Sequence, residues 1–167
     1  MSLDAWQREL RRQFGRAQPF DLRNVGPEVV FSDFHVRNPR SGGTYRVAIR
    51  GAEPGENYCT CADFATNALG TCKHIEFVLG KLERHRGSRA ILQRGFRPPY
   101  SEVVLQYGAK REVRFRPGVA CPRALTTLAA RYFDADQILR SEAFGIFESF
   151  LSKVTDLDHD SGATTTS

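Results

Sequence analysis

Hydrophobic residues recur at helical spacing at the start of the chain. Leu3, Trp6 and Leu10 are three and four positions apart, and Gly15 follows them. This spacing predicts a short amphipathic helix over residues 3–14. We expect the helix to pack on the domain through its apolar side, with its cationic side chains turned toward water. These cations are Arg8, Arg11 and Arg12.

Two β-rich runs come next, at residues 28–36 and 44–50, separated by the loop-forming sequence Arg-Asn-Pro-Arg-Ser-Gly-Gly. Together they predict an antiparallel hairpin. In the second run Tyr45, Val47 and Ile49 share one face of the strand and arginines occupy the other. This alternation is typical of a half-buried strand.

A second helical pattern is formed by four apolar residues at positions i, i+3, i+4 and i+7, and it predicts a helix over residues 73–85. Thr71 is the expected N-cap, and the helix should end near Gly87. Residues 95–99 read Gly-Phe-Arg-Pro-Pro and indicate a break, because consecutive prolines cannot continue a helix. The four apolar residues are Ile75, Val78, Leu79 and Leu82.

The rest of the chain predicts a second hairpin and two further helices. The strands of this hairpin should span residues 101–107 and 110–116. The helices should span residues 122–133 and 141–154, and the first of them should begin with Pro122 at its N1 position.

These elements predict an α+β fold in which a β-hairpin leads into a strand, a ligand loop and a helix, followed by a second hairpin and two short helices. We expect an N-terminal part at residues 1–97, with a central core at 55–85, and a C-terminal part at residues 98–155. The polar residues 156–167 predict a disordered tail.

Composition supports a folded protein, since 41% of the 167 residues are apolar. The chain begins without a signal-peptide pattern and lacks an apolar run of membrane-spanning length, so we expect a cytoplasmic protein that does not enter a membrane. The net charge is +5, and the basic excess falls in the first hundred residues. Most of the cations are arginines, which weakly favours a nucleic-acid partner, although a GC-rich genome produces the same bias.

Three cysteines and one histidine lie close together in sequence as Cys59-Thr-Cys61 and Cys72-Lys-His74. In an extended strand, residues two apart point to the same side, so Cys59 and Cys61 can present both sulfurs to one point. Residues two apart in a helix diverge, so Cys72 must precede the helix, with His74 in its first turn. The pattern predicts one structural zinc ion held by three sulfurs and one nitrogen.

Two other interpretations of this cluster remain open. The cysteines could be ordinary small buried residues beside a surface histidine. Alternatively, Cys59 and Cys61 could pair with Cys72 as a thiol switch, which gives His74 no role.

The run from Tyr58 to Leu79 resembles the SWIM zinc finger, whose pattern is Cys-x-Cys, a variable gap, then Cys-x-His. The resemblance implies the same four ligands, Cys59, Cys61, Cys72 and His74. SWIM fingers occur in bacterial Swi/Snf-type helicases, Mutator-type transposases and some ubiquitin ligases, where they are thought to contact DNA or protein partners. The wider stretch from Tyr45 to about Leu151 looks like the N-terminal region of the bacterial helicases. The chain has no G-x-x-x-x-G-K-[ST] motif, so we expect no ATPase and, more generally, no enzyme.

Cationic residues follow the predicted zinc helix, with a single acidic residue, Glu83, between residues 81 and 97. They could bind phosphates or merely form a solvated helix end. We therefore expect an accessory nucleic-acid-binding domain, most simply for DNA, that serves a Swi/Snf-type motor. The competing hypothesis is an adaptor that docks onto a helicase or other partner protein through apolar surface near Phe77 and the C-terminal helices. The candidate nucleic-acid contacts are Lys81, Arg84, Arg86, Arg89, Arg114 and Arg116.

Overall fold

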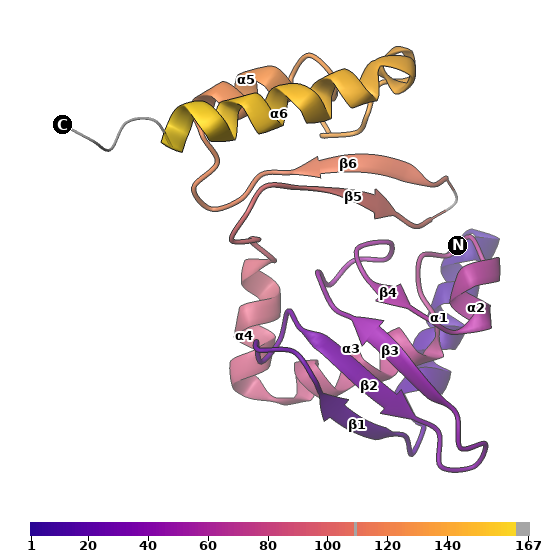
Figure 1. Ribbon diagram of the computed structural model, residues 1–167. Coiled ribbons are helices and arrows are strands. Elements are labelled where there is room, and N and C mark those ends of the chain that lie inside the picture. The colour runs from indigo at the N-terminus through magenta and orange to yellow at the C-terminus, as the bar shows by residue number, and fades with distance from the viewer. Residues whose placement is uncertain (109, 163–167) are drawn as a thin grey trace. The chain divides into compact units, whose positions relative to one another are not determined.

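The structure is a computed structural model that describes residues 1–108 and 110–162 (Figure 1). It is an α+β fold with a four-stranded sheet, a two-stranded sheet and helices around them. The strands are β1 Asp21–Asn24, β2 Asp33–Arg37, β3 Thr44–Ala48, β4 Tyr58–Cys59, β5 Glu102–Gln106 and β6 Glu112–Arg116. The helices are α1 Leu3–Arg16, α2 Ala62–Thr66, α3 Lys73–Arg84, α4 Arg86–Arg94, α5 Arg123–Ala129, the 3-10 helix η1 Ser141–Ile146 and α6 Phe147–Gly162.

The chain divides into two compact units, each with its own hydrophobic core. The first unit comprises Met1–Phe96 together with Gln106–Arg111. The second comprises Arg97–Leu105 and the described residues from Glu112 onward. In the described part of the chain, none of the helices combines the length and the hydropathy that crossing a bilayer requires.

The four-stranded sheet of the first unit is antiparallel, with strand order β1-β2-β3-β4. Phe34 of β2 pairs with Val47 of β3, and Val47 pairs in turn with Cys59 of β4. All three side chains are buried, whereas Arg46 beside Val47 is exposed. The alternation predicted for residues 44–50 is therefore confirmed, and the buried face of the sheet leads directly to the first cysteine.

The predicted hairpin is confirmed, because β2 pairs antiparallel with β3, but its first strand is shorter than predicted and the sheet contains a further strand, β1. Residues 28–32 do not form a strand, because the amides of Val25 and Gly26 bond to the carbonyl of Asp33 and close a loop ahead of β2. Strand β1 was missed, since its sequence Asp-Leu-Arg-Asn contributes one apolar residue, Leu22, to the alternation.

Helix α3 packs against the inner face of this sheet and contributes five buried residues to the core of the first unit: Ile75, Phe77, Val78, Leu79 and Leu82. Its N-cap lies one residue later than predicted: Cys72 holds that position, and Thr71 instead donates its hydroxyl to Glu76 at 2.8 Å. The predicted helix over residues 73–85 is otherwise confirmed. Helix α4 was not predicted, and it starts directly after His85.

Helix α1 packs against α3 with the opposite orientation to the one we predicted. Leu3, Trp6 and Leu10 are exposed to solvent, and so is Phe14. The side facing α3 contains Gly15, where an added Cβ would lie 2.4 Å from the carbonyl oxygen of Lys73. Only a residue without a side chain allows this close approach.

The arginines of α1 explain this reversal, because each of them finds a partner in the first unit. Arg8 donates to the carbonyl of Leu69 at 3.0 Å. The other three form ion pairs at 2.9–3.6 Å: Arg11 with Asp63, Arg12 with Glu76, and Arg16 with Glu83. The acidic side chains of α2 and α3 therefore bind the cationic side of α1, and the apolar side is left facing water.

The second unit contains the β5–β6 hairpin, whose strands run in opposite directions, and the C-terminal helices (Figure 1). Its core is built mainly from aromatic rings, including Phe115, Tyr132, Phe133 and Phe150. Helix α5 is shorter than predicted, and Pro122 holds its N-cap rather than N1.

The predicted helix over residues 141–154 is a 3-10 turn that continues into α6. Helix α6 extends to Gly162, into the segment for which we predicted disorder, and residues 163–167 lie outside the described part.

Candidate metal centre and cationic surface

The sheet supplies the first two sulfurs of the cysteine cluster. Cys59 lies in the edge strand β4, buried, while Thr60 beside it is exposed. Cys61 follows in extended conformation as the N-cap of α2, and its Sγ accepts a hydrogen bond from the amide of Phe64 at 3.4 Å. Both cysteines therefore point to the same buried side, as the two-residue spacing predicted.

The start of α3 supplies the other two side chains. Cys72 is extended, with φ −152° and ψ 170°, so it lies outside the helix that begins at Lys73. His74 is the second helical residue, and both side chains are buried. This change of backbone conformation directs Cys72 and His74 toward one point, although residues two apart within a helix would diverge.

The four ligand atoms lie within 4.8 Å of one another. Cys59 Sγ and His74 Nδ1 are 3.7 Å apart. Zinc bonds of ordinary length imply sulfur-to-sulfur and sulfur-to-nitrogen edges of about 3.5–3.8 Å in a tetrahedron. The four residues therefore fit one metal ion after a contraction of about an ångström or less along the longest edge.

A tightly turned loop joins the two pairs of ligands. Gly70 has φ +71°, and an added Cβ would lie 2.6 Å from the amide nitrogen of Gly55 and 2.7 Å from the carbonyl oxygen of Tyr107. Asn67 bonds to the amide of Leu69 and to the carbonyl of Thr71, at 2.8 and 3.1 Å. These contacts fix the chain immediately before the third ligand.

Aromatic rings hold His74 in place, a feature that the sequence pattern did not reveal. Tyr45 stacks on the imidazole with ring centres 4.2 Å apart, and Phe20 lies 5.3 Å away on a tilted plane. Nε2 is buried without a hydrogen-bond partner among the described residues, while Nδ1 faces the sulfurs. In this orientation Nδ1 is the nitrogen available to a metal, and packing of these rings takes the place of the hydrogen bond that usually holds the other nitrogen of a metal-binding histidine.

The crowding of three thiols shifts their proton affinities in opposite directions. The hydrogen bond with Cys61 raises the pKa of Cys59 to about 12. Hydrogen bonds with Cys59 and Cys61 likewise raise the pKa of Cys72. The pKa of Cys61 is lowered, first by the hydrogen bond from Cys59 and then by the one from Cys72. A divalent cation at this point would replace the shared protons and allow all three sulfurs to be thiolates.

The chemistry of this donor set is specific. Three thiols and one imidazole suit a tetrahedral, thiophilic divalent ion better than calcium or magnesium, which prefer oxygen ligands. The structure thus contains a buried Cys3His cluster that could hold one metal ion.

Four of the predicted nucleic-acid contacts lie on α3 and α4 or at their junction, all four exposed: Lys81, Arg84, Arg86 and Arg89. Together with Arg94 on α4 they form what we call the α3–α4 cationic surface. Within the part of the chain that the structure describes, none of these five residues has a carboxylate within ion-pair distance. Glu83, the acidic residue nearest to them in sequence, is paired with Arg16.

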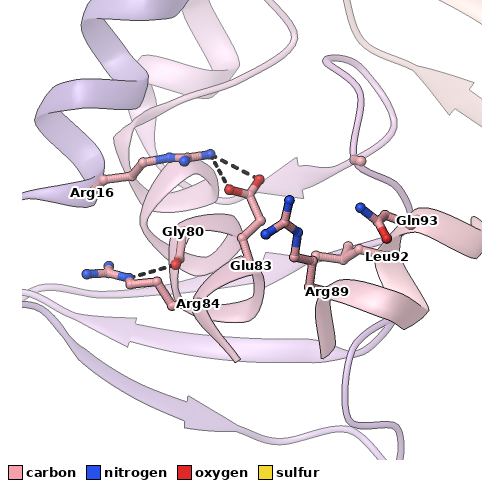
Figure 2. A pocket seen from close by; sticks show the side chains of 8 residues that line it. Arg16, Gly80, Glu83, Arg84, Arg89, Leu92 and Gln93 are labelled. Carbon is pink, nitrogen blue, oxygen red and sulfur yellow. Dashed lines mark hydrogen bonds and ion pairs between the residues drawn. The ribbon is translucent and has the colours of Figure 1, made fainter. Parts of the chain in front are cut away.

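A pocket of about 620 Å³ opens beside this surface, and Figure 2 shows the side chains around it. Arg84 and Arg89 lie at its wall, on either side of the Arg16–Glu83 ion pair. Arg84 also donates Nε to the carbonyl of Gly80 at 2.8 Å. Sequence reasoning missed Arg16 as a neighbour of this region, because the contact joins α1 to α3 across 67 positions.

The two remaining predicted contacts belong to the second unit. Arg116 is paired with Glu102 at 3.0 Å, which offsets its charge. Arg114 is half-buried, with its Nε enclosed and without a hydrogen-bond partner in the described residues. Neither residue presents an exposed guanidinium comparable to those of the α3–α4 cationic surface.

Comparison of the chain with family models, with curated proteins and with solved structures finds no match.

Proposed function

We propose that this chain is a zinc-binding module of the SWIM type that binds the phosphate backbone of a nucleic acid through the α3–α4 cationic surface. Zinc would fasten β4 to the start of α3, and α3 would carry the cations outward from that fixed point. DNA is the simplest partner. The proposal rests on one observation: five exposed cations, all on or between two adjoining helices, have no acidic partner in the described residues.

Three features support zinc as the ion. The donor set is the one that zinc takes in structural sites, the four donor atoms lie within 4.8 Å of one another, and all four side chains are buried. With four protein ligands, no position is left for a reacting water molecule. We therefore propose a binding role and assign no catalysis to this site.

The likeness to SWIM fingers rests on the Cys-x-Cys and Cys-x-His spacing, on the strand before it and on the helix after it. The proposed partner of the module is a Swi/Snf-type motor or another DNA-processing protein. Such a protein would supply the ATPase, because the chain itself has no phosphate-binding loop motif.

The surface predicted for the alternative role as a protein adaptor is present only in part, because the C-terminal helices expose Phe144, Ile146 and Leu151 whereas Phe77 is buried. Phe77 is fully buried in the core of the first unit, so it cannot contact a partner. The exposed side of α1 is a better candidate and favours a protein contact in addition to nucleic-acid binding.

Fluorescence anisotropy of labelled duplex and single-stranded DNA, titrated with the zinc-loaded chain, tests the proposal. Neutralising about five phosphates predicts a slope of about −4.5 for log K against log salt, or roughly 500-fold weaker binding at 200 mM than at 50 mM salt. In the double variant Arg84→Ala/Arg89→Ala the slope should fall to about −2.7, or roughly 40-fold.

Arg40→Ala is the matched control, since Arg40 is an exposed arginine in the β2–β3 loop, away from the α3–α4 cationic surface. Its slope should equal that of the parent. No binding at 50 mM salt, or an unchanged slope in the double variant, would refute the nucleic-acid proposal and favour the adaptor.

A further inference from the structure

The outward side of α1 carries a continuous apolar stripe. Leu3, Trp6, Leu10 and Phe14 are separated by three, four and four positions, so they fall on one side of the helix. Their exposed fractions are 67%, 48%, 44% and 55%. Scattered single hydrophobic residues are normal on a protein surface, but a row along a helix indicates a contact site. We call these four residues the α1 stripe.

The α1 stripe is free of charge because the cations of α1 point the other way. Its arginines contact acidic side chains or a carbonyl of the first unit, as described above. Glu9, near the stripe, lies 3.4 Å from Arg12. A membrane-binding helix would instead keep basic residues beside its apolar side to meet anionic lipids. This charge distribution favours a protein surface over a lipid surface.

We propose that the α1 stripe is the contact between two copies of this chain, packed as an antiparallel helix pair about a two-fold axis. In this arrangement the axis passes near the middle of the stripe. Leu3 of one copy then faces Phe14 of the other, and Trp6 faces Leu10. Each contact joins a large ring to a smaller aliphatic side chain, so the stripe is complementary to itself, as a two-fold interface requires.

The exposed area agrees with a weak dimer. Side chains of about 150–250 Å², exposed to these fractions, leave roughly 320–540 Å² of apolar surface on each copy. Two copies would bury about 640–1,070 Å², which is at or below the lower limit for a specific interface and in the range of weak, transient association. The dimer should therefore be weak, so that it is populated at high protein concentration and dissociates on dilution.

The chain contains a single tryptophan, and it lies in the α1 stripe. Its fluorescence therefore reports on the proposed interface directly. Sedimentation of the full zinc-loaded chain over 5 to about 500 µM should show a monomer–dimer equilibrium. Over the same range Trp6 emission should shift to the blue, and acrylamide quenching should weaken, in parallel with the dimer fraction.

Leu10→Glu should remain monomeric at all these concentrations with an unchanged circular dichroism spectrum, because Leu10 faces solvent in the monomer. Val29→Glu is the matched control, as Val29 is an exposed apolar residue in a loop of the same unit, and it should dimerise like the parent. Sedimentation and Trp6 fluorescence involve no nucleic acid, so their outcome does not depend on whether the proposed nucleic-acid binding is correct.

Three results would overturn the proposal. The first is a monomer at every concentration with Trp6 fully open to acrylamide. The second is a blue-shifted emission that does not depend on concentration, which would mean that another part of the same chain covers the stripe. The third is a dimer that Leu10→Glu leaves intact, which would place the interface elsewhere.

Discussion

Replacing Cys72 by serine should unfold the first unit and leave the second unit folded. Cys72 is fully buried at the N-cap of α3, and the other three ligand side chains lie within 4.8 Å of it. Serine cannot supply a thiolate to the proposed zinc ion, and its hydroxyl would be buried in place of the Cys72 thiol. The same outcome is expected when a strong chelator removes the metal from the parent chain.

The magnitude follows from the size of the first unit. A folded unit of about 100 residues is stable by roughly 5–15 kcal/mol, whereas binding of a structural zinc is worth about 10–16 kcal/mol at neutral pH. The loss therefore equals or exceeds the whole stability of the unit. The second unit has a separate aromatic core and contains none of the four ligands, so it should keep its structure.

Hydrogen exchange followed by mass spectrometry distinguishes the two units within one sample. Amides of α3 should lose protection in Cys72→Ser, while those of β6 and α5 should keep it. Cys121→Ser is the matched control, because Cys121 is a free, half-buried cysteine outside the cluster. The reasoning is refuted if α3 stays protected after complete removal of metal, or if native mass spectrometry of the parent finds no bound zinc.

Two further predictions concern stability, both measured by urea unfolding of the zinc-loaded protein. Gly70→Ala should lower the free energy of unfolding by about 2–3 kcal/mol, and Gly42→Ala by only about 1 kcal/mol. Both glycines have positive φ, but only Gly70 lacks space for a Cβ. Equal effects of the two substitutions would contradict this reasoning. Burial alone raises the pKa of Asp33, but hydrogen bonds from Arg46 and Arg50 outweigh it and hold that pKa below its ordinary value. Asp33 therefore contributes stability above its ordinary pKa of 3.8 that is lost as the pH falls through its lowered pKa. The difference in stability between the parent and Asp33→Asn should be present at pH 6 and shrink as the pH falls below 3.8; a difference that stayed constant on acidification would refute this role.

Sequence spacing was sufficient to predict the local geometry of the cluster. Alternation in a strand placed Cys59 and Cys61 on one side, and the incompatibility of a two-residue spacing with a helix placed Cys72 before α3. Both arguments depend only on backbone periodicity, which is why they held. The rings around His74 come from Phe20 and Tyr45, which are distant in sequence, so local spacing contains no information about them.

The orientation of α1 shows where periodicity fails. The spacing of Leu3, Trp6 and Leu10 correctly predicted a helix with two unlike sides, but hydrophobicity alone suggested the wrong side for packing. The side on which α1 packs is determined by acidic partners far along the chain and by the close approach of Gly15 to α3. Helix α4 was missed for a related reason, since its one fully buried hydrophobic residue, Leu92, is too little to produce a recognisable pattern.

The way α1 is attached has a consequence for the behaviour of the protein in different buffers. Ion pairs, rather than a buried apolar seam, join this helix to the first unit, and dissolved electrolyte weakens such pairs while it leaves hydrophobic cores intact. Raising ionic strength should thus loosen the N-terminal helix well before the sheet or α3 responds. The fraction of molecules in which α1 is detached from the first unit would then depend on the ionic strength of the buffer.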